Sequence, residues 1–516
     1  MNHLKLLEQY LWQLIPKIFK TTDINIFAET QLNFWKQMKL PIDILKQYYG
    51  FPQFRGVQEK IINKLILDKK HSLVLMPTGG GKSLIYQIPA LIFDGGTIVI
   101  SPLIALMQDQ VDALKKRNIP AEFINSTVSK ENREKRLQSF VSGKTKLLYV
   151  TPERFRKKDF VSEIKKAKIS LLAIDEAHCI SEWGHDFRPD YSRIGEFRAI
   201  IGNPLTVALT ATATIEVQKD IVEKLNLRSE EVELFHEGIK RPNLRLEAKD
   251  IWGYDDKLAK ILDALKTYKG STIIYFSLIK TLDEFSGYLH ANKINHLVYH
   301  GKLEPNNRKY VQRKFLQNEN QIILATNAFG MGIDKSDIRL IIHAEIPSSI
   351  ESYYQEIGRA GRDGKDSLCL LLYDQSDLLT QMQFIKWSNP SAEYYARIYN
   401  ILRTDGDKVA SMGVEFIREQ MSFKDRSDFR VEAVLSMLDR YGVTDGEIEK
   451  NNLKLVDILH PNLEDDGRLE NKLMNDNKKL LAMVNYFKEE NCRRVFISDY
   501  FGFPGEKQCG NCDCCS

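Results

Sequence analysis

The sequence has no apolar run long enough to cross a membrane. A membrane-spanning helix needs about 18 consecutive apolar residues or more. The apolar segment at the start of the chain is interrupted by Glu8, Gln9 and Gln13. It also has no small-residue cleavage site, so we interpret it as a helix rather than a signal peptide. We therefore expect a cytosolic protein with no membrane partner.

The sequence contains few cysteines and has only a small net charge. The 516 residues include seven cysteines and carry a formal net charge of +4, which is too weak a bias to argue for a nucleic-acid partner by itself. Five of the cysteines lie within the last 25 residues. Because disulfides are rare in the cytosol, this cluster indicates a metal site. The composition otherwise, with 43% hydrophobic residues, is typical of a globular protein of several domains.

Short apolar runs alternate with amphipathic segments from Ser72 to Leu225, and the same pattern restarts near Asp255. Buried strands that alternate with helices imply parallel sheets. We therefore predict an α/β fold with two tandem domains that meet near residues 236–245. The runs expected to form strands are HSLVLMP, GTIVISP, KLLYVTP, LLAIDEAH and LTVALTATAT in the first domain and STIIYFS, NHLVYHG, QIILATNAF, IRLIIHAEIP and SLCLLLYD in the second.

The pattern changes after Asp374. Residues 390–460 are typical of short helices with few strands, among them a strand in LKLVDIL. A small winged-helix domain and a helical adapter without DNA contact fit this pattern equally well. The following segment, 461–479, is polar, so we expect a surface connection there.

The segment MPTGGGKS (76–83) lies between an apolar run and a helix-like stretch. Backbone N–H groups of a glycine turn and the dipole of the following helix form an anion site. We predict that Lys82 reaches the β- and γ-phosphates of ATP and that Ser83 ligates Mg²⁺. The alternative is an ordinary glycine turn. Met76 departs from the strict pattern, which has glycine there; the remaining predicted loop residues are Thr78, Gly79, Gly80 and Gly81.

Two adjacent acids, Asp175 and Glu176, follow the run LLAI. A carboxylate at the C-terminal end of a parallel strand can hold Mg²⁺ and its waters. We assign that role to Asp175, and to Glu176 the role of base or positioner for the attacking water. Taken alone, the pair is equally well explained as solvated loop residues.

These motifs together resemble superfamily 2 helicases and specifically the RecQ family. FRGVQEK (54–60) is similar to the family's adenine-recognising segment. The resemblance implies that Gln58 reads the base edge and that Arg55 lies near the nucleotide, although the family usually has Pro-Gly in place of Gly56 and Val57. ALTATAT (208–214) resembles the motif that couples hydrolysis to domain movement. The implied fold is two tandem RecA-like domains.

Two segments of the second domain, ATNAFGMGIDK (325–335) and YYQEIGRAGRDG (353–364), also match this family. The match implies that Asp334 and Gln355 belong to the nucleotide site. Gln355, Arg359 and Arg362 have the spacing of one helix face. An arginine from another domain can stabilise the charge of a transferred phosphoryl group. We predict that Arg362 is this arginine finger and Arg359 its neighbour; the alternative is an exposed basic helix.

The segment HCISEWGHDFRPDYSR (178–193) resembles the aromatic-rich loop of RecQ proteins. Aromatic side chains stack on the bases of single-stranded DNA while basic groups follow the phosphates. We assign DNA contacts to four of its residues: Trp183, Phe187, Arg188 and Tyr191. The alternative is a core stripe, because the aromatics are four residues apart, but Gly184 and Pro189 break a helix there. We therefore predict an exposed loop that transmits the effect of DNA binding to Glu176.

Four cysteines, Cys492, Cys509, Cys512 and Cys515, have a spacing that suits tetrahedral Zn²⁺. The segment resembles the RecQ zinc module through CRR, YFG and CGNCD. Cys514 is an alternative to Cys515 as the fourth ligand. Since the α/β domains have cores of their own, we expect loss of the metal to unfold this tail and spare the ATP site. Cys179 and Cys369 are isolated and are interpreted as packed thiols.

The long stretch before the cysteines resembles the RecQ subgroup whose winged helix precedes the zinc module. The resemblance implies an ATP-dependent DNA helicase of 3′→5′ polarity that acts in repair and recombination. Its cofactors would be ATP, Mg²⁺ and Zn²⁺. Its partners would be single-stranded DNA, forked or partial-duplex DNA and a single-stranded-DNA-binding protein. Its location would be the cytoplasm, in association with the bacterial nucleoid. The alternatives are an RNA helicase and a DNA-dependent ATPase that separates no strands. We expect a helical extension at 1–44, RecA-like domains at 45–235 and 236–375, a helical or winged-helix-like domain at 376–475 and a zinc-binding module at 476–516.

Overall fold

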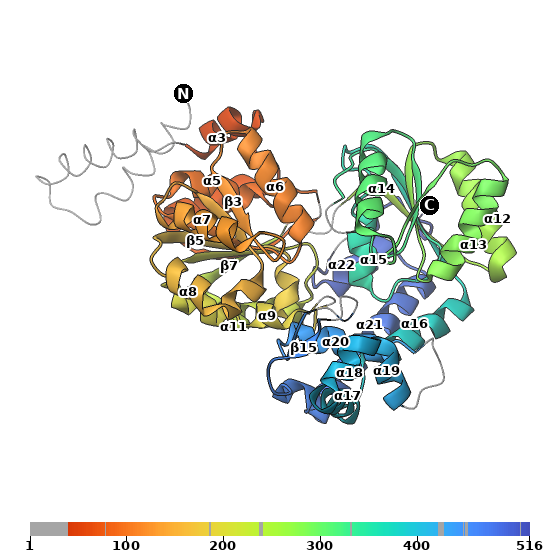
Figure 1. Cartoon of the computed structure of the whole chain (residues 1–516). Helices are drawn as coiled ribbons and strands as arrows, with labels where there is room; N and C mark the ends of the chain where they lie inside the picture. The colour runs from red at the N-terminus through yellow and green to blue at the C-terminus, as the bar shows by residue number, and fades with distance from the viewer. Residues whose placement is uncertain are drawn as a thin grey trace, which may run out of the picture.

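The computed structural model describes residues 40–515 except 78, 185–186, 237–240, 331–332, 422–427, 447, 449–451 and 506. Within these residues, no helix combines the length and apolar character needed to cross a membrane. Two α/β domains lie side by side, and a helical region rests against both of them (Figure 1). The predicted helical extension lies mostly outside the described residues.

The first domain is built on a seven-stranded parallel sheet in the order β3-β4-β2-β5-β6-β1-β7. Its two faces carry separate hydrophobic cores, one packed under α4, α5 and α6 and the other under α7, α8, α10 and α11. The strands are β1 (His71–Leu75), β2 (Gly96–Ile100), β3 (Ala121–Ile124), β4 (Leu147–Val150), β5 (Ile169–Ile174), β6 (Leu205–Thr210) and β7 (Val232–His236). The helices are α3 (Pro41–Ile44), α4 (Gln58–Asn63), α5 (Leu84–Ile92), α6 (Ile104–Lys116), α7 (Lys130–Val141), α8 (Lys158–Ile164), α9 (Pro189–Ser192), α10 (Ile194–Ile200) and α11 (Ile215–Lys224).

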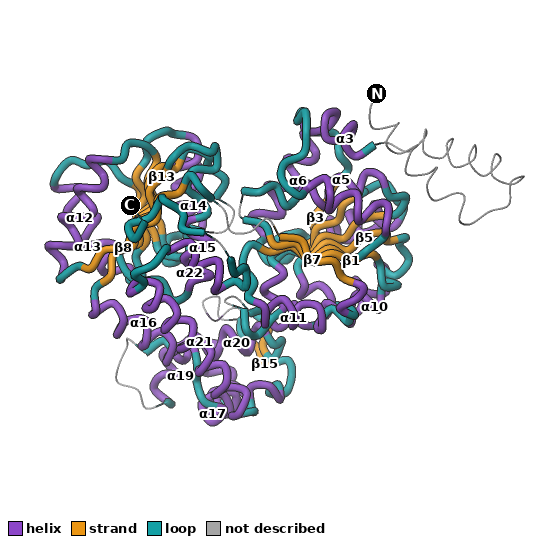
Figure 2. The backbone as a smooth tube through the Cα atoms, turned by 180° about the vertical axis from the view of Figure 1, so that it is seen from behind, coloured by secondary structure: helices purple, strands orange, loops and turns teal. Residues whose placement is uncertain are grey.

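The second domain repeats this design with a six-stranded parallel sheet in the order β10-β11-β9-β12-β13-β8. Helices cover both faces of each sheet (Figure 2). The strands are β8 (Leu244–Asp250), β9 (Ser271–Tyr275), β10 (Leu297–Tyr299), β11 (Ile322–Ala325), β12 (Ile338–His343) and β13 (Ser367–Tyr373). The helices are α12 (Gly253–Thr267), α13 (Ile279–Ala291), α14 (Pro305–Gln317) and α15 (Ile350–Ile357).

Every run predicted as a strand is a strand, so the prediction of two parallel α/β domains is confirmed. Three strands were missed: β3, β7 and β8, each at the edge of its sheet. Edge strands bury fewer of their side chains, as the mixed exposure of β7 illustrates, and their apolar signal is correspondingly weak.

The region after the second sheet is helical, as predicted, with one antiparallel strand pair. The helices share a core of their own. The pair, β14 (Thr444–Asp445) and β15 (Lys454–Leu455), contains the strand expected in LKLVDIL. Helices followed by a short antiparallel pair are the elements of a winged-helix domain. The helices are α16 (Gln375–Ser388), α17 (Ala392–Thr404), α18 (Gly406–Met412), α19 (Val414–Gln420) and α20 (Arg430–Arg440).

The surface connection expected at 461–479 is wrong. Most of that segment belongs to α21 (Asp466–Lys488), a helix of 23 residues. Asp465 caps its N-terminus by accepting a hydrogen bond from Arg468 N at 3.0 Å. The polar residues that suggested a loop cover the exposed side of a helix whose apolar residues Leu469, Leu480 and Met483 are buried.

The cysteine-rich tail lies against the edge of the second sheet rather than apart from it. After α22 (Arg493–Tyr500), Cys512 forms a parallel bridge with Leu246 of β8. Asp513 N donates to Leu246 O at 3.1 Å, and Asp513 Oδ2 accepts from Ala248 N at 2.7 Å. Tail side chains, among them Ile497 and Phe501, are part of the core under this sheet.

Candidate nucleotide, DNA and zinc sites

The predicted phosphate loop connects β1 to the N-terminus of α5, as a phosphate-binding turn requires. Gly79 and Gly81 have φ angles of 83° and 75°, a left-handed conformation that favours glycine. Lys82 Nζ donates to Met76 O at 3.2 Å, across the mouth of the loop. Thr78 lies outside the described residues. Lys82 and Ser83 thus lie at the start of α5, next to the glycine turn, and their predicted contacts with phosphate and metal stay predictions.

Gln58 supports this loop directly. Its Nε2 donates to Gly80 O at 2.9 Å, and its Oε1 accepts from Arg55 N at 3.0 Å. The side chain is buried, whereas Arg55 is exposed. Both ends of the Gln58 amide are therefore used within the protein, and the predicted contacts of Gln58 and Arg55 with adenine stay predictions.

Asp175 and Glu176 follow β5 at the same edge of the sheet as the phosphate loop. Burial first, and then the adjacent Glu176 carboxylate, raise the pKa of Asp175 to about 7, against the lowering effect of Lys82. A buried carboxyl beside a second acid binds a cation readily, because the cation compensates for the buried negative charge and for the repulsion between the two acids. The residues present therefore suit Mg²⁺.

The acidic pair contacts the segment 208–214 through a histidine. His178 Nδ1 lies 2.9 Å from Thr210 Oγ1 and 3.4 Å from Glu176 Oε2. Thr210 Oγ1 in turn donates to Thr212 O at 3.1 Å. Glu176 therefore lies close to the end of β6, and the coupling role that the resemblance implies for this segment stays a prediction.

Arg362 of the second domain reaches the phosphate loop of the first. A Cβ on Gly79 would lie 3.1 Å from Arg362 Cδ, so the arginine stem lies in tight contact with this glycine and a larger residue would require the stem to shift. Arg362 Nη1 forms an ion pair with Asp334 at 2.6 Å, while its Nε is buried and has no hydrogen-bond partner among the described residues. The two predicted nucleotide residues Asp334 and Arg362 are thus brought together at the domain boundary.

The prediction that Gln355, Arg359 and Arg362 share one helix face is wrong. Helix α15 ends at Ile357, and both arginines lie in the turn that follows. Gly361, with a φ of 54°, bends the chain there. Gln355 lies half-buried on α15, and Arg359 is buried near Gly330, beside the 331–332 gap.

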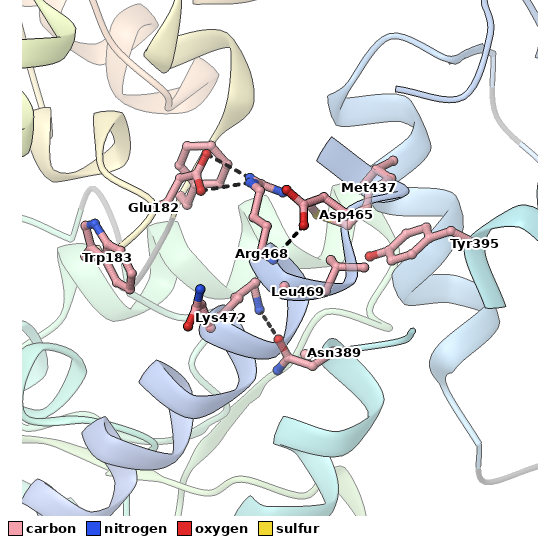
Figure 3. A pocket seen from close by; sticks show the side chains of 14 residues that line it. Glu182, Trp183, Asn389, Tyr395, Met437, Asp465, Arg468, Leu469 and Lys472 are labelled. Atoms are coloured by element: carbon pink, nitrogen blue, oxygen red, sulfur yellow. Dashed lines mark hydrogen bonds and ion pairs between the residues drawn. The ribbon is translucent and has the colours of Figure 1, made fainter. Parts of the chain in front are cut away.

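The aromatic-rich loop is held by the C-terminal helices. Arg468 of α21 binds the Glu182 carboxylate with two nitrogens, at 2.8 and 3.0 Å, as Figure 3 shows. Lys479 Nζ donates to Gly184 O at 2.7 Å, and Arg440 Nη1 donates to Phe187 O at 3.2 Å. Trp183 lines a cavity of about 480 Å³ beside Arg468 and remains 45% exposed. Two of these partners, Arg468 and Lys479, could not be predicted, because the polar composition of 461–479 indicates a surface connection rather than the helix α21.

The four predicted DNA contacts of this loop differ in their surroundings. Trp183 and Phe187 line the cavity and are accessible. Tyr191 is fully buried in the core of the first domain and its hydroxyl donates to Asp175 O at 3.3 Å. A buried ring does not stack on a base, so the assignment of Tyr191 to DNA is corrected here. Arg188 Nη1 donates to Pro102 O at 3.0 Å, in the connection between β2 and α6.

The sulfur atoms of Cys492, Cys509, Cys512 and Cys515 all lie within 4.8 Å of one another, close enough for four Zn–S bonds of about 2.3 Å. Cys514 Sγ instead faces Glu489 O at 3.4 Å. Burial opposes ionisation of Cys492, but backbone N–H groups of Val495 and Cys509 lower its pKa to about 7, which favours the thiolate. Cys179 and Cys369 are buried in the sheet cores, as packed thiols should be.

Comparison with known proteins identifies the family of the chain. The chain matches the models for the DEAD/DEAH box helicase (55–221), the helicase conserved C-terminal domain (255–364) and RecQ zinc-binding (457–516). It is 35% identical to the probable ATP-dependent DNA helicase RecS of Bacillus subtilis, over 92% of this chain and 90% of that protein. The chain belongs to the RecQ helicase family.

Further RecQ relatives match over a shorter part of their length. Identity to the ATP-dependent DNA helicase RecQ of Bacillus subtilis is 44%, over 67% of this chain and 58% of that protein. Among solved structures, the DUF1998 helicase MrfA bound to DNA aligns with a TM-score of 0.55 and 16% identity, covering 84% of this chain and 61% of that one. Saccharomyces cerevisiae Dbp5 bound to RNA and ADP BeF3 aligns with a TM-score of 0.53 and 17% identity, covering 67% and 90%. At such identities these structures show the two-domain fold alone.

Proposed function

We propose that this RecQ-family chain hydrolyses ATP between its two α/β domains and uses the hydrolysis to unwind DNA. The observation that carries the proposal is the position of Arg362, which lies over Gly79 of the phosphate loop from the opposite domain. An ATP site completed by both domains links hydrolysis to their relative movement. Lys82 would hold the phosphates, and Arg362 would stabilise the charge that develops in the transition state.

Mg²⁺ is part of the proposal. Ser83 and the Asp175 carboxylate are the groups that would hold it, and Glu176 would orient the attacking water. The metal would neutralise charge on the phosphate oxygens; the chain's own contribution is to fix the two acids and Lys82 around it. The raised pKa of Asp175 supports this assignment. A bound cation would counteract both of its causes, burial of the carboxylate and repulsion from Glu176.

DNA is preferred over RNA because of the aromatic-rich loop and the zinc module. Trp183 and Phe187 offer accessible faces for base stacking. By family resemblance we propose 3′→5′ movement and a role in DNA repair and recombination. A single-stranded-DNA-binding protein as partner, a location at the nucleoid and the domain boundaries given above also remain proposals.

Strand displacement tests the proposal. Matched DNA and RNA duplexes with a 3′ or a 5′ single-stranded tail would be incubated with ATP and Mg²⁺. We expect displacement of the 3′-tailed DNA and its loss in Lys82→Ala, which should still bind DNA. RNA displacement, or DNA-stimulated ATP hydrolysis without displacement, would point to one of the two alternatives.

A further inference from the structure

The zinc module contacts the segment that joins the two α/β domains. Arg494, two residues after the zinc ligand Cys492, donates to Arg241 O at 2.6 Å and also to Leu244 O. Asn511 Nδ2 donates to Pro242 O at 2.8 Å. Three carbonyl groups within 241–244 are therefore held by side chains of the module.

The same segment holds the turn that carries the two catalytic arginines. Arg241 Nη1 donates to Gly358 O at 3.1 Å and its Nη2 to Ala360 O at 2.5 Å. Asn243 Nδ2 donates to Gly361 O at 2.8 Å. We call residues 358–362 the arginine turn, because Arg359 and Arg362 lie in it.

These bonds act where the backbone has lost its helical partners. Helix α15 ends at Ile357, so the carbonyl groups that follow lack the N–H donors of another helical turn. A guanidinium satisfies two of them at once with charge-assisted hydrogen bonds. Arg241 is half-buried and burial lowers its pKa, so the carbonyl oxygens that it binds help to stabilise its charged form.

We propose that Arg241 and Arg494 are positioning residues for ATP hydrolysis. Arg241 fixes the arginine turn, and Arg494 fixes Arg241 from the zinc module, so that Arg362 is held against the phosphate loop. The inference rests on the proposed function, because it presumes that Arg362 acts on ATP. A displacement of about 1 Å in a catalytic group can reduce a rate by two orders of magnitude, which makes the arginine turn sensitive to these bonds.

The test separates turnover from binding. Arg241→Ala, Arg241→Lys and Arg494→Ala would be measured for kcat and KM of ATP at saturating single-stranded DNA, for affinity toward a fluorescent ATP analogue, and for zinc content. We expect kcat of Arg241→Ala to fall at least about tenfold, with zinc retained and nucleotide affinity changed by less than about threefold. Arg241→Lys should recover part of the rate, because an ammonium can still bind one carbonyl.

Lys249→Ala is the matched control. It removes a cation from β8, next to the junction, that pairs only with Glu247 at 3.5 Å among the interactions described. A wild-type kcat in Arg241→Ala, or a fall in affinity as large as the fall in kcat, would overturn the inference. If Arg241→Ala does not fold, Arg494→Ala decides by the same criteria. Failure of the proposed function is distinguishable, since the wild-type protein itself would then lack ATP hydrolysis.

Discussion

Arg362 is the residue whose side chain crosses from one α/β domain to the other. Its stem packs on Gly79, its Nη1 binds Asp334, and its Nε is free of hydrogen bonds within the described residues. Asp334 is 89% exposed, so it can exchange its place on the guanidinium for a phosphate oxygen. A residue placed in this way acts on transition-state charge more than on nucleotide affinity.

Replacing Arg362 with alanine should therefore reduce turnover and spare binding. We expect kcat for ATP to fall by at least about 100-fold, with the affinity for a fluorescent ATP analogue changed by less than threefold. Arg313→Ala, an exposed arginine of α14, is the control and should behave as wild type. Equal losses of affinity and rate in Arg362→Ala would contradict the role.

The two adjacent cysteines near the end of the chain should differ sharply. Cys515 belongs to the four-sulfur cluster, whereas Cys514 Sγ contacts Glu489 O. Metal analysis of purified variants should find one zinc in Cys514→Ser and almost none in Cys515→Ser. The reverse result would make Cys514 the fourth ligand.

At the scale of elements, α21 joins parts of the molecule that are far apart in the sequence. Its first turns bind the aromatic-rich loop through Arg468, and its last turns enter the core of the second domain through Met483 and Tyr486. A rigid helix between these points couples the position of the loop to that of the second domain.

The bond between Glu182 and Arg468 should restrain the aromatic-rich loop. Both side chains are partly exposed, and such pairs contribute about 0–1 kcal/mol. Glu182→Gln should therefore raise amide hydrogen exchange at Trp183 and Phe187 by up to about fivefold. Glu196→Gln, which breaks an exposed pair with Arg193, should leave exchange in the loop unchanged. Unaltered exchange in Glu182→Gln would show that Lys479 and Arg440 hold the loop without this pair.

A second contact between elements predicts a pH effect on stability. Asp377 of α16 pairs with Lys257 of α12 at 3.2 Å, yet burial outweighs the lysine and raises the pKa of Asp377 from 3.8 to about 7. A carboxyl whose pKa is higher in the folded state stabilises the fold below about pH 4 and loses that contribution as pH rises to about 7.

Thermal unfolding at a series of pH values tests this contact. The fall in Tm between pH 4 and pH 7 should be smaller in Asp377→Asn than in the wild type, because asparagine does not ionise. Asp263→Asn, an exposed position on α12, should keep the wild-type profile. Identical profiles for Asp377→Asn and the wild type would mean that Asp377 titrates with an ordinary pKa.

At the scale of the whole molecule, the zinc module is part of the second domain. Cys492, Cys512, Ile497 and Phe501 share a core with strands β8, β9, β11, β12 and β13. The expectation that loss of zinc unfolds the tail and spares the ATP site stays a prediction. The shared packing adds a second effect, since the same side chains fill space under the second sheet.

Removing zinc should therefore lower the stability of the second domain as well. Structural zinc contributes on the order of 10 kcal/mol in isolated modules, and here part of that free energy supports the shared core. Calorimetry after chelation should show the transition of the second domain shifted to lower temperature and that of the first domain little changed. If the tail unfolds while the transition temperatures of both domains stay unchanged, zinc does not stabilise the second domain.

The sequence by itself determined the centre of each sheet and the chemistry of the sites. Strands buried on both faces are continuous apolar runs, and the phosphate loop, the acidic pair and the four cysteines are local patterns whose spacing carries their geometry. These features depend on residues close together in the chain, so they could be predicted without the fold.

Tertiary structure decided what depends on distant partners. The edge strands β3, β7 and β8 are strands because a neighbour pairs with them, and α21 is a helix because its buried side packs on both the loop and the second domain. Tyr191 lies in the core although Gly184, Pro189 and the resemblance to the family's aromatic-rich loop favoured an exposed DNA contact. The end of α15 and the hold of Arg241 on the arginine turn were set by residues more than 100 positions away. Local sequence patterns predict which side chains of a segment are buried. Which other segment they pack against is determined only when the whole chain folds.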